Sequence, residues 1–162
     1  MAFISGARAI PTYSLKARIN PTKKELIVTG EITNLSPGKK HSFYLNKNFK
    51  IKSIVLDEKN NDYSFDLQGK APPYVDLARP LVLKSSKDVS QFEFSYSGKI
   101  NDIVSDVNMI SDDLVELAIY SAWFPFSGEI KKFNYRLELN IPKQFVVTGN
   151  GKVSLLQTDK KT

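Results

Sequence analysis

The chemistry open to this chain is limited first by its histidine and cysteine content. His41 is the only histidine among 162 residues, and cysteine is absent. A zinc protease helix needs two histidines one turn apart together with a carboxylate, and most activated nucleophiles need a histidine base. No such arrangement is recognisable here, and disulfides are ruled out. His41 follows Lys39-Lys40 at the expected start of a strand, so we expect it to be an ordinary exposed side chain.

Carboxylates are the second group that could carry chemistry. Five of them gather in one part of the chain: Asp102, Asp106, Asp112, Asp113 and Glu116. A glycosidase needs two facing carboxyl groups, and a cation could use the same oxygens, but the regular spacing of a calcium loop is missing. Exposed carboxylates are the norm, so a solvated acidic loop over 102–113 is the favoured interpretation. Glu116 stands apart, because an expected strand carries it toward Trp123.

An aromatic cluster follows directly. It consists of Tyr120, Trp123, Phe124 and Phe126. Such residues could form an exposed platform for a sugar or a protein partner. Aromatic side chains more often bury large areas in a core or against a neighbouring domain, and we favour that interpretation.

Composition indicates what class of protein positions these groups. Hydrophobic residues make up 41% and charged residues 25%, as in an ordinary folded domain. We expect a single β domain over 1–162, with frayed ends at 1–10 and 158–162. No run reaches the ~20 apolar residues of a membrane span and no signal peptide is visible; with cysteine absent, this favours a cytoplasmic location. The net charge of +6 comes largely from scattered lysines at turns, which favours edge protection over nucleic-acid binding.

The most regular hydrophobic pattern lies at 133–141. Its apolar residues share one parity: Phe133, Tyr135, Leu137, Leu139 and Ile141. This alternation predicts a strand with one buried and one solvated face. Pro142 ends the strand, because proline has no N–H to donate to a ladder. A second strand is predicted at 145–148, followed by an Asn150-Gly151 hairpin turn and a returning arm at 152–157.

Shorter patterns predict the remaining elements. Strands are expected at 13–20, 26–32, 43–45, 51–56, 63–67, 81–83, 92–97 and 115–119. Gly30 should mark a bulge or a close backbone approach, and the proline-rich stretch 69–80 should be irregular. Residues 101–113 hold either one short helix or a long loop. The chain is therefore predicted to be all-β, an antiparallel β-sandwich or saddle-shaped curled sheet of about ten strands with at most one short helix.

Several segments together resemble a known family. They are the strand pattern of 13–19 and 26–34, Leu81-Val82-Leu83 with FEFSYSG at 92–98, YSAWFP at 120–125, and 133–142 with 147–151. They resemble the N-terminal β domain of M1-family zinc metallopeptidases, of the aminopeptidase N and leukotriene A4 hydrolase type, over nearly the whole chain. Two departures occur: Gly149 replaces a serine, and Phe126-Ser127-Gly128-Glu129 replaces the family's usual sequence after the aromatic-proline element.

The resemblance implies a saddle-shaped domain that precedes a catalytic domain. This chain would then be a non-catalytic domain of an M1-like aminopeptidase, bracing the catalytic domain of the same parent chain and walling one side of the peptide-substrate cleft. Zinc would belong to the missing catalytic domain, with no cofactor in this chain. Glu116 stands near the position of an acidic or amide residue that holds the substrate's free amino group in the family.

Two rival functions remain from the sequence. A freestanding β-sandwich binding module for carbohydrate or protein would use Trp123 as its platform. A single-strand nucleic-acid binder is the weaker rival, and it would show a steep salt dependence.

Overall fold

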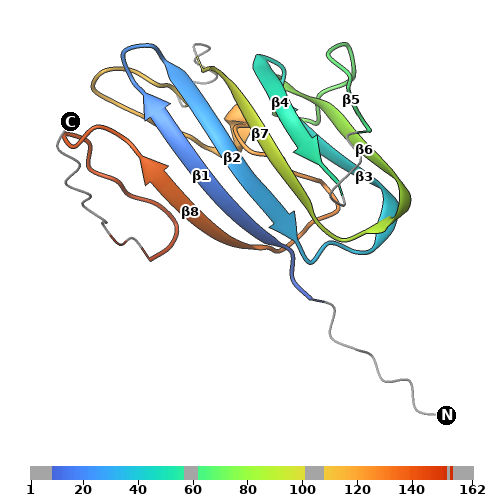
Figure 1. Ribbon diagram of the computed structural model, residues 1–162. Coiled ribbons are helices and arrows are strands. Elements are labelled where there is room, and N and C mark those ends of the chain that lie inside the picture. Colours follow the sequence, from blue (N-terminus) through green and yellow to red (C-terminus); the bar gives the residue numbers. More distant parts are fainter. Residues whose placement is uncertain (1–8, 57–61, 101–107, 153, 155–162) are drawn as a thin grey trace.

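Figure 1 shows the computed structural model, which describes residues 9–56, 62–100, 108–152 and 154. Eight strands and one 3-10 turn form the secondary structure of these residues, and no α-helix occurs among them. In chain order they are β1 (Thr12–Asn20), β2 (Glu25–Thr33), β3 (Gly38–Asn46), β4 (Phe49–Val55), β5 (Tyr63–Phe65), β6 (Ala78–Val89), β7 (Phe92–Lys99), η1 (Ile119–Ser121) and β8 (Asn134–Asn140). The predicted all-β class is therefore confirmed.

The strands form two sheets. The larger has the order β4-β7-β2-β1-β8, and the smaller has the order β3-β6-β5. Neighbouring strands are antiparallel except for β1 and β8, which run parallel. In Figure 1 the smaller sheet lies beside β4 and β7, whereas β8 forms the opposite edge of the larger sheet.

The hairpin of β1 and β2 shows how local sequence builds the larger sheet. Pro21 begins a four-residue turn that ends at Lys24, whose N–H donates to the Pro21 carbonyl at 2.9 Å. A Cβ added to Gly30 would lie only 2.6 Å from the Ser14 carbonyl oxygen. The predicted close approach at Gly30 is therefore confirmed, and the ladder continues through this position without a bulge.

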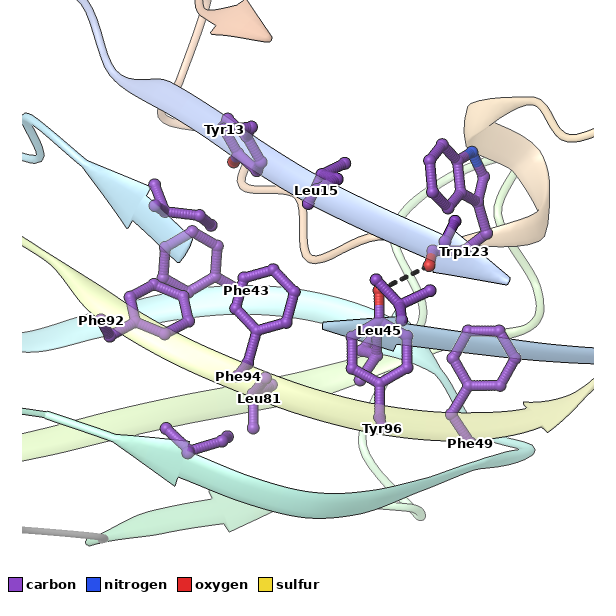
Figure 2. Packing of buried hydrophobic residues seen from close by; sticks show 14 of the residues in the cluster. Tyr13, Leu15, Phe43, Leu45, Phe49, Leu81, Phe92, Phe94, Tyr96 and Trp123 are labelled. Carbon is purple, nitrogen blue, oxygen red and sulfur yellow. Dashed lines mark hydrogen bonds between the residues drawn. The ribbon is translucent and has the colours of Figure 1, made fainter. Parts of the chain in front are cut away.

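The hydrophobic core lies where the two sheets face each other, because the alternating strands turn their apolar sides inward. Figure 2 shows Phe43, Leu45 and Leu81 of the smaller sheet meeting β7 of the larger one. The Phe43 and Phe92 rings lie 5.1 Å apart between centroids, which ties β3 to β7 across the core. Burial of this apolar face supplies most of the driving force for the fold.

Several element boundaries differ from the sequence prediction. About ten strands were expected, whereas the described residues form eight. The strand expected at 81–83 extends over all of β6, since pairing with β3 continues through its polar residues as far as Val89. His41 is partly buried rather than exposed, and its Nε2 lies 3.0 Å from the Val89 carbonyl oxygen.

Two expected strands are absent from the described residues. Residues 115–119 contain only an isolated bridge from Val115 to Ile110 and the start of η1. Residues 145–148 are not in a strand, and no hairpin forms at Asn150-Gly151 within the described part. Much of the predicted returning arm, residues 101–107 of the helix or loop expected at 101–113, and most of the frayed ends lie outside the described residues; residues 108–113 contain no helix.

The prediction for β8 is half right. The strand forms, but the apolar side that should be buried is open: Phe133, Tyr135 and Leu137 are 40%, 49% and 38% exposed. In the parallel register Tyr135 lies beside Tyr13, and Leu137 lies beside Leu15. These side chains therefore point to the core side of the sheet, at a place where the second layer has already ended.

No described helix has the length and hydrophobicity that a membrane crossing requires.

Candidate functional site

The candidate site is built on residues 119–126, which we call the aromatic segment. It starts with η1 and carries all four residues of the predicted platform. The segment runs along the edge of β3: the Tyr44 N–H donates to the Phe126 carbonyl at 2.7 Å, and the Phe126 N–H donates back at 3.1 Å. The aromatic segment thus extends the second layer from the smaller sheet toward β1.

A buried asparagine holds the start of this segment. Asn46, which is fully buried, donates from its Nδ2 to the Ser121 carbonyl at 2.7 Å, and its N–H donates to the Ala122 carbonyl at 3.0 Å. Ala122 takes the left-handed conformation, with φ 48°. A non-glycine residue adopts this conformation only where its surroundings impose it, so the turn is firmly positioned.

Trp123 is anchored in the core. The Tyr96 hydroxyl donates to the Trp123 carbonyl at 2.7 Å, as Figure 2 shows, and the indole is 9% exposed. Burial raises the pKa of Tyr96 well above its ordinary value, because the charged phenolate would lose its water. The favoured core interpretation therefore holds for Trp123, which leaves little of its indole free to stack on a ligand.

Phe124 links the aromatic segment to the β1 and β8 side of the larger sheet. Its ring meets Tyr13 edge-on at 5.9 Å between centroids, and it lies 6.2 Å from the ring of Phe133. Tyr13 and Phe133 are themselves 4.8 Å apart. This aromatic group covers the start of β1, where Tyr13 is 1% exposed, and it forms the limit of the second layer.

The four predicted platform residues therefore separate into two kinds. Phe124 and Phe126 are partly buried, the second against the Tyr44 ring at 5.6 Å, and Trp123 is buried. Tyr120 is 46% exposed, as is its neighbour Ile119 at 45%. Only the η1 end of the aromatic segment offers an apolar surface to a partner.

Glu116 lies before this segment but not in a strand, contrary to the sequence prediction. Its N–H donates to the Met109 carbonyl at 2.9 Å, and the residue is half-buried. Among the described residues, backbone strand pairing here is limited to this contact and the bridge between Ile110 and Val115. A side chain takes the next donor: the Oδ1 of buried Asn108 accepts from the Ala118 N–H at 2.6 Å. Competition of this kind is typical of asparagine, and it explains why alternation at 115–119 failed to predict structure.

Asn46 and Asn108, the two buried amides that shape the site, were not predicted from the sequence. Neither stands in a recognisable motif, and their burial depends on contacts 75 and 10 residues away. Of the acidic group, Asp112 accepts from the Thr22 hydroxyl at 2.8 Å, whereas Asp102 and Asp106 lie outside the described residues. Within the described ranges no cluster of three or more potential metal ligands occurs.

An open hollow lies elsewhere, at the turn between β1 and β2. It is lined by Thr22, Lys23, Lys24, Glu25 and Lys99. These residues do not belong to the aromatic segment, and the acidic Glu25 reduces the positive charge of the hollow. It therefore adds nothing to the candidate site.

The sequence matches no protein-family model and no curated protein. Solved structures do share its fold. Yeast LTA4 hydrolase in complex with bestatin matches with a TM-score of 0.50 and 14% identity, over 83% of this chain and 23% of that chain. Native leukotriene A4 hydrolase from Saccharomyces cerevisiae matches at 0.48 and 15%, over 83% and 24%. A mutant M1 zinc metallopeptidase from Deinococcus radiodurans, bound to a Tyr-Ser-Ala substrate, matches at 0.41 and 9%, over 67% and 24%.

These comparisons bear on the fold. The resemblance to the N-terminal β domain of M1 zinc metallopeptidases is confirmed at this level by the likeness to yeast LTA4 hydrolase. The chain spans about a quarter of the length of the structures it matches.

Proposed function

We propose that this chain is a non-catalytic N-terminal domain of an M1-like zinc aminopeptidase. It braces the catalytic domain of its parent chain and forms one wall of the peptide-substrate cleft. The observation that carries this proposal is the fold likeness, which covers 83% of this chain but only 23% of yeast LTA4 hydrolase. A unit of this size corresponds to one part of such an enzyme.

In this proposal the chemistry belongs to the catalytic domain. That domain would hold zinc with its own residues, and the metal would activate water and polarise the scissile carbonyl. The one histidine here, His41, lies against the Val89 carbonyl within the smaller sheet. The contribution of this chain is therefore to position and to enclose.

The bracing surface is the η1 end of the aromatic segment. Ile119 and Tyr120 are exposed there, while Ser121 and Ala122 behind them are fully buried and bonded to Asn46. An apolar surface on a rigid support loses little conformational entropy when a partner covers it. This makes residues 119–120 a suitable contact for a neighbouring domain.

Glu116 is the residue proposed to reach the substrate. Its carboxylate would pair with the free amino group of a bound peptide, an interaction that becomes strong only where a neighbouring domain excludes water. Glu116 is half-buried beside the aromatic segment, which supports this role.

Kinetics of the parent polypeptide that carries this chain would test the proposal. The isolated chain with added zinc should show no aminopeptidase turnover, whereas the parent should. In the parent, Glu116→Gln should raise KM for peptides with a free amino terminus by about tenfold, since a charged pairing is lost. Glu129→Gln, an exposed carboxylate beyond the aromatic segment, is the matched control and should leave KM unchanged. Turnover by the isolated chain that a chelator abolishes would overturn the proposal.

The freestanding binding module receives less support. That hypothesis relied on Trp123 as a stacking platform, and the indole is 9% exposed. Stacking on a sugar requires an open aromatic face, which Tyr120 alone retains among the four predicted residues.

A further inference from the structure

β8 is the edge of the larger sheet that most needs a partner. Among the described residues it pairs as a strand with β1 alone. Two of its apolar side chains remain exposed, Tyr135 at 49% and Leu137 at 38%, whereas Leu139 is partly buried against the core. A long edge strand with exposed apolar residues is a template for pairing with another strand.

The backbone of β8 shows which residues face the free edge. The Asn134 N–H donates to the Pro11 carbonyl on the β1 side, at 2.9 Å. Because successive residues of a strand direct their N–H and C=O groups to opposite edges, Arg136 and Glu138 also face β1. Tyr135, Leu137 and Leu139 therefore present their backbone groups to the free edge.

We propose that β8 pairs antiparallel with β8 of a second copy of this chain, about a twofold axis at Leu137. Leu137 then faces Leu137 of the second copy, and Tyr135 faces Leu139, each pair exchanging backbone hydrogen bonds. Arg136 faces Glu138 in the non-hydrogen-bonded positions between them, where side chains approach most closely. Two five-stranded sheets would thereby become one continuous sheet.

Charge is what selects this partner and this register. Moving the axis by one residue to Arg136 keeps the outward backbone groups paired but sets Arg136 against itself. Moving it to Glu138 sets two carboxylates against each other. Like charges directly opposite one another destabilise a strand pair, whereas opposite charges stabilise it. Only the axis at Leu137 matches arginine with glutamate, and it does so twice because of the symmetry.

The neighbouring strand β1 adds a further charge to this contact. Lys16 of β1 lies 3.0 Å from the Glu138 carboxylate, and both side chains are exposed. In the proposed pair Glu138 would lie between Lys16 of its own chain and Arg136 of the other. A carboxylate between two cations gains from both, and a network of this kind holds better than an isolated surface pair.

A different occupant of the edge is the chain's own segment 141–152. It returns near β8, and the Tyr135 hydroxyl donates to the Asn150 carbonyl at 2.5 Å. This contact involves a side chain on the open face, however, and no strand pairing joins the segment to β8 in the described residues. If this segment closes the edge, the chain will be monomeric.

Sedimentation of the full chain over a range of concentrations tests the proposal. The chain should form a dimer, and Arg136→Glu or Glu138→Arg should each weaken it by about tenfold or more, because both symmetric pairs become repulsive. The double variant, Arg136→Glu with Glu138→Arg, restores opposite charges between the two copies but sets a second cation beside Lys16, so it should recover much of the affinity lost in either single variant. Lys50→Glu on β4, the other edge of the sheet, should leave the dimer unchanged.

A cross-link provides a measurement that does not depend on affinity. The chain has no cysteine, so Leu137→Cys introduces a single thiol. Facing residues in a hydrogen-bonded pair have Cα atoms about 5.5 Å apart, within disulfide range. Mild oxidation should join two copies of Leu137→Cys but not of Leu139→Cys, whose equivalent thiols would lie four residues out of register. A monomer at every concentration, failure of the double variant to recover affinity over the single variants, or equal cross-linking at both positions would each overturn the proposal.

Discussion

The two edge strands of the five-stranded sheet, β4 and β8, differ in burial, lysine content and register. On β4, Phe49 and Ile54 are buried at 4% and 1% exposure, Lys50 and Lys52 are exposed, and the register shifts between Ile51 and Ser53. Lysines and irregular register are devices that keep an edge from pairing. β8 has no lysine, keeps a regular register with β1 and leaves the apolar side chains of Tyr135 and Leu137 exposed.

Burial of an edge strand in this sheet depends on the second layer. The smaller sheet lies behind the β4 side, and the aromatic segment extends this cover only as far as the start of β1 (Figure 1). β8 has as clear an alternation as any strand in the chain, yet of its apolar residues only Leu139 packs against the core, and Tyr135 and Leu137 are left exposed. An edge with exposed apolar residues and without lysine is one that a partner can complete.

The largest effect is expected when one aliphatic side chain at each edge of the sheet is truncated. Ile54→Ala should lower the free energy of unfolding by about 2–5 kcal/mol, because it leaves a cavity in a packed core. Leu137→Ala should lower it by about 1 kcal/mol or less in dilute solution, since that side chain is already half in water. Urea denaturation of both variants gives the two values. Equal losses would show that β8 is covered as fully as β4.

An effect of intermediate size is expected for the buried tyrosines on the strands next to each edge. Tyr96 lies beside β4 and Tyr13 beside β8, and burial raises the pKa of both hydroxyls above the ordinary value of 10.0. Tyr96→Phe should cost about 1–3 kcal/mol, because the Trp123 carbonyl loses its buried donor. Tyr120→Phe, at an exposed position, is the control and should cost nothing measurable.

The same tyrosines predict an alkaline limit to stability. A raised pKa in the folded state means that the native protein holds these protons after the unfolded chain has released them. The contribution of the two protonated hydroxyls to the free energy of unfolding is complete below pH 10, and it is lost as the pH rises toward their folded-state pKa values. Thermal unfolding from pH 8 to 11 should show this fall, and Tyr96→Phe should reduce its slope. An unchanged slope would contradict the assignment to Tyr96.

The smallest effect is expected at the ion pair of β8. Lys16 lowers the pKa of Glu138 through a hydrogen bond and its charge. Because this pKa is lowered in the folded state, the ionised pair stabilises the native state at pH values above the ordinary pKa of 4.5. This stabilisation is lost as the pH falls through the folded-state pKa. Because both side chains are exposed, Glu138→Gln should leave the denaturation midpoint of the monomer unchanged at moderate salt. A clear destabilisation would show that the pair is shielded from water.

Sequence reasoning succeeded where local and tertiary preferences agree. It located β1, β2 and β7, whose alternating residues find a second layer to cover them. It failed at 115–119, where Asn108 takes the backbone hydrogen bond of Ala118, and at 145–148, where no described strand offers a ladder. Alternation indicates which residues share a face, but pairing requires a neighbour at the right place.

Strand period and residue type are local properties, so the amino-acid sequence was enough to predict a β protein with inward-facing alternation and a single histidine. Which apolar faces are covered depends on where distant segments end, and this follows only from the tertiary structure. In the folded chain Trp123 is buried and bonded to Tyr96, Tyr120 is exposed, and Leu137 faces water in a strand whose pattern resembles that of its buried neighbours.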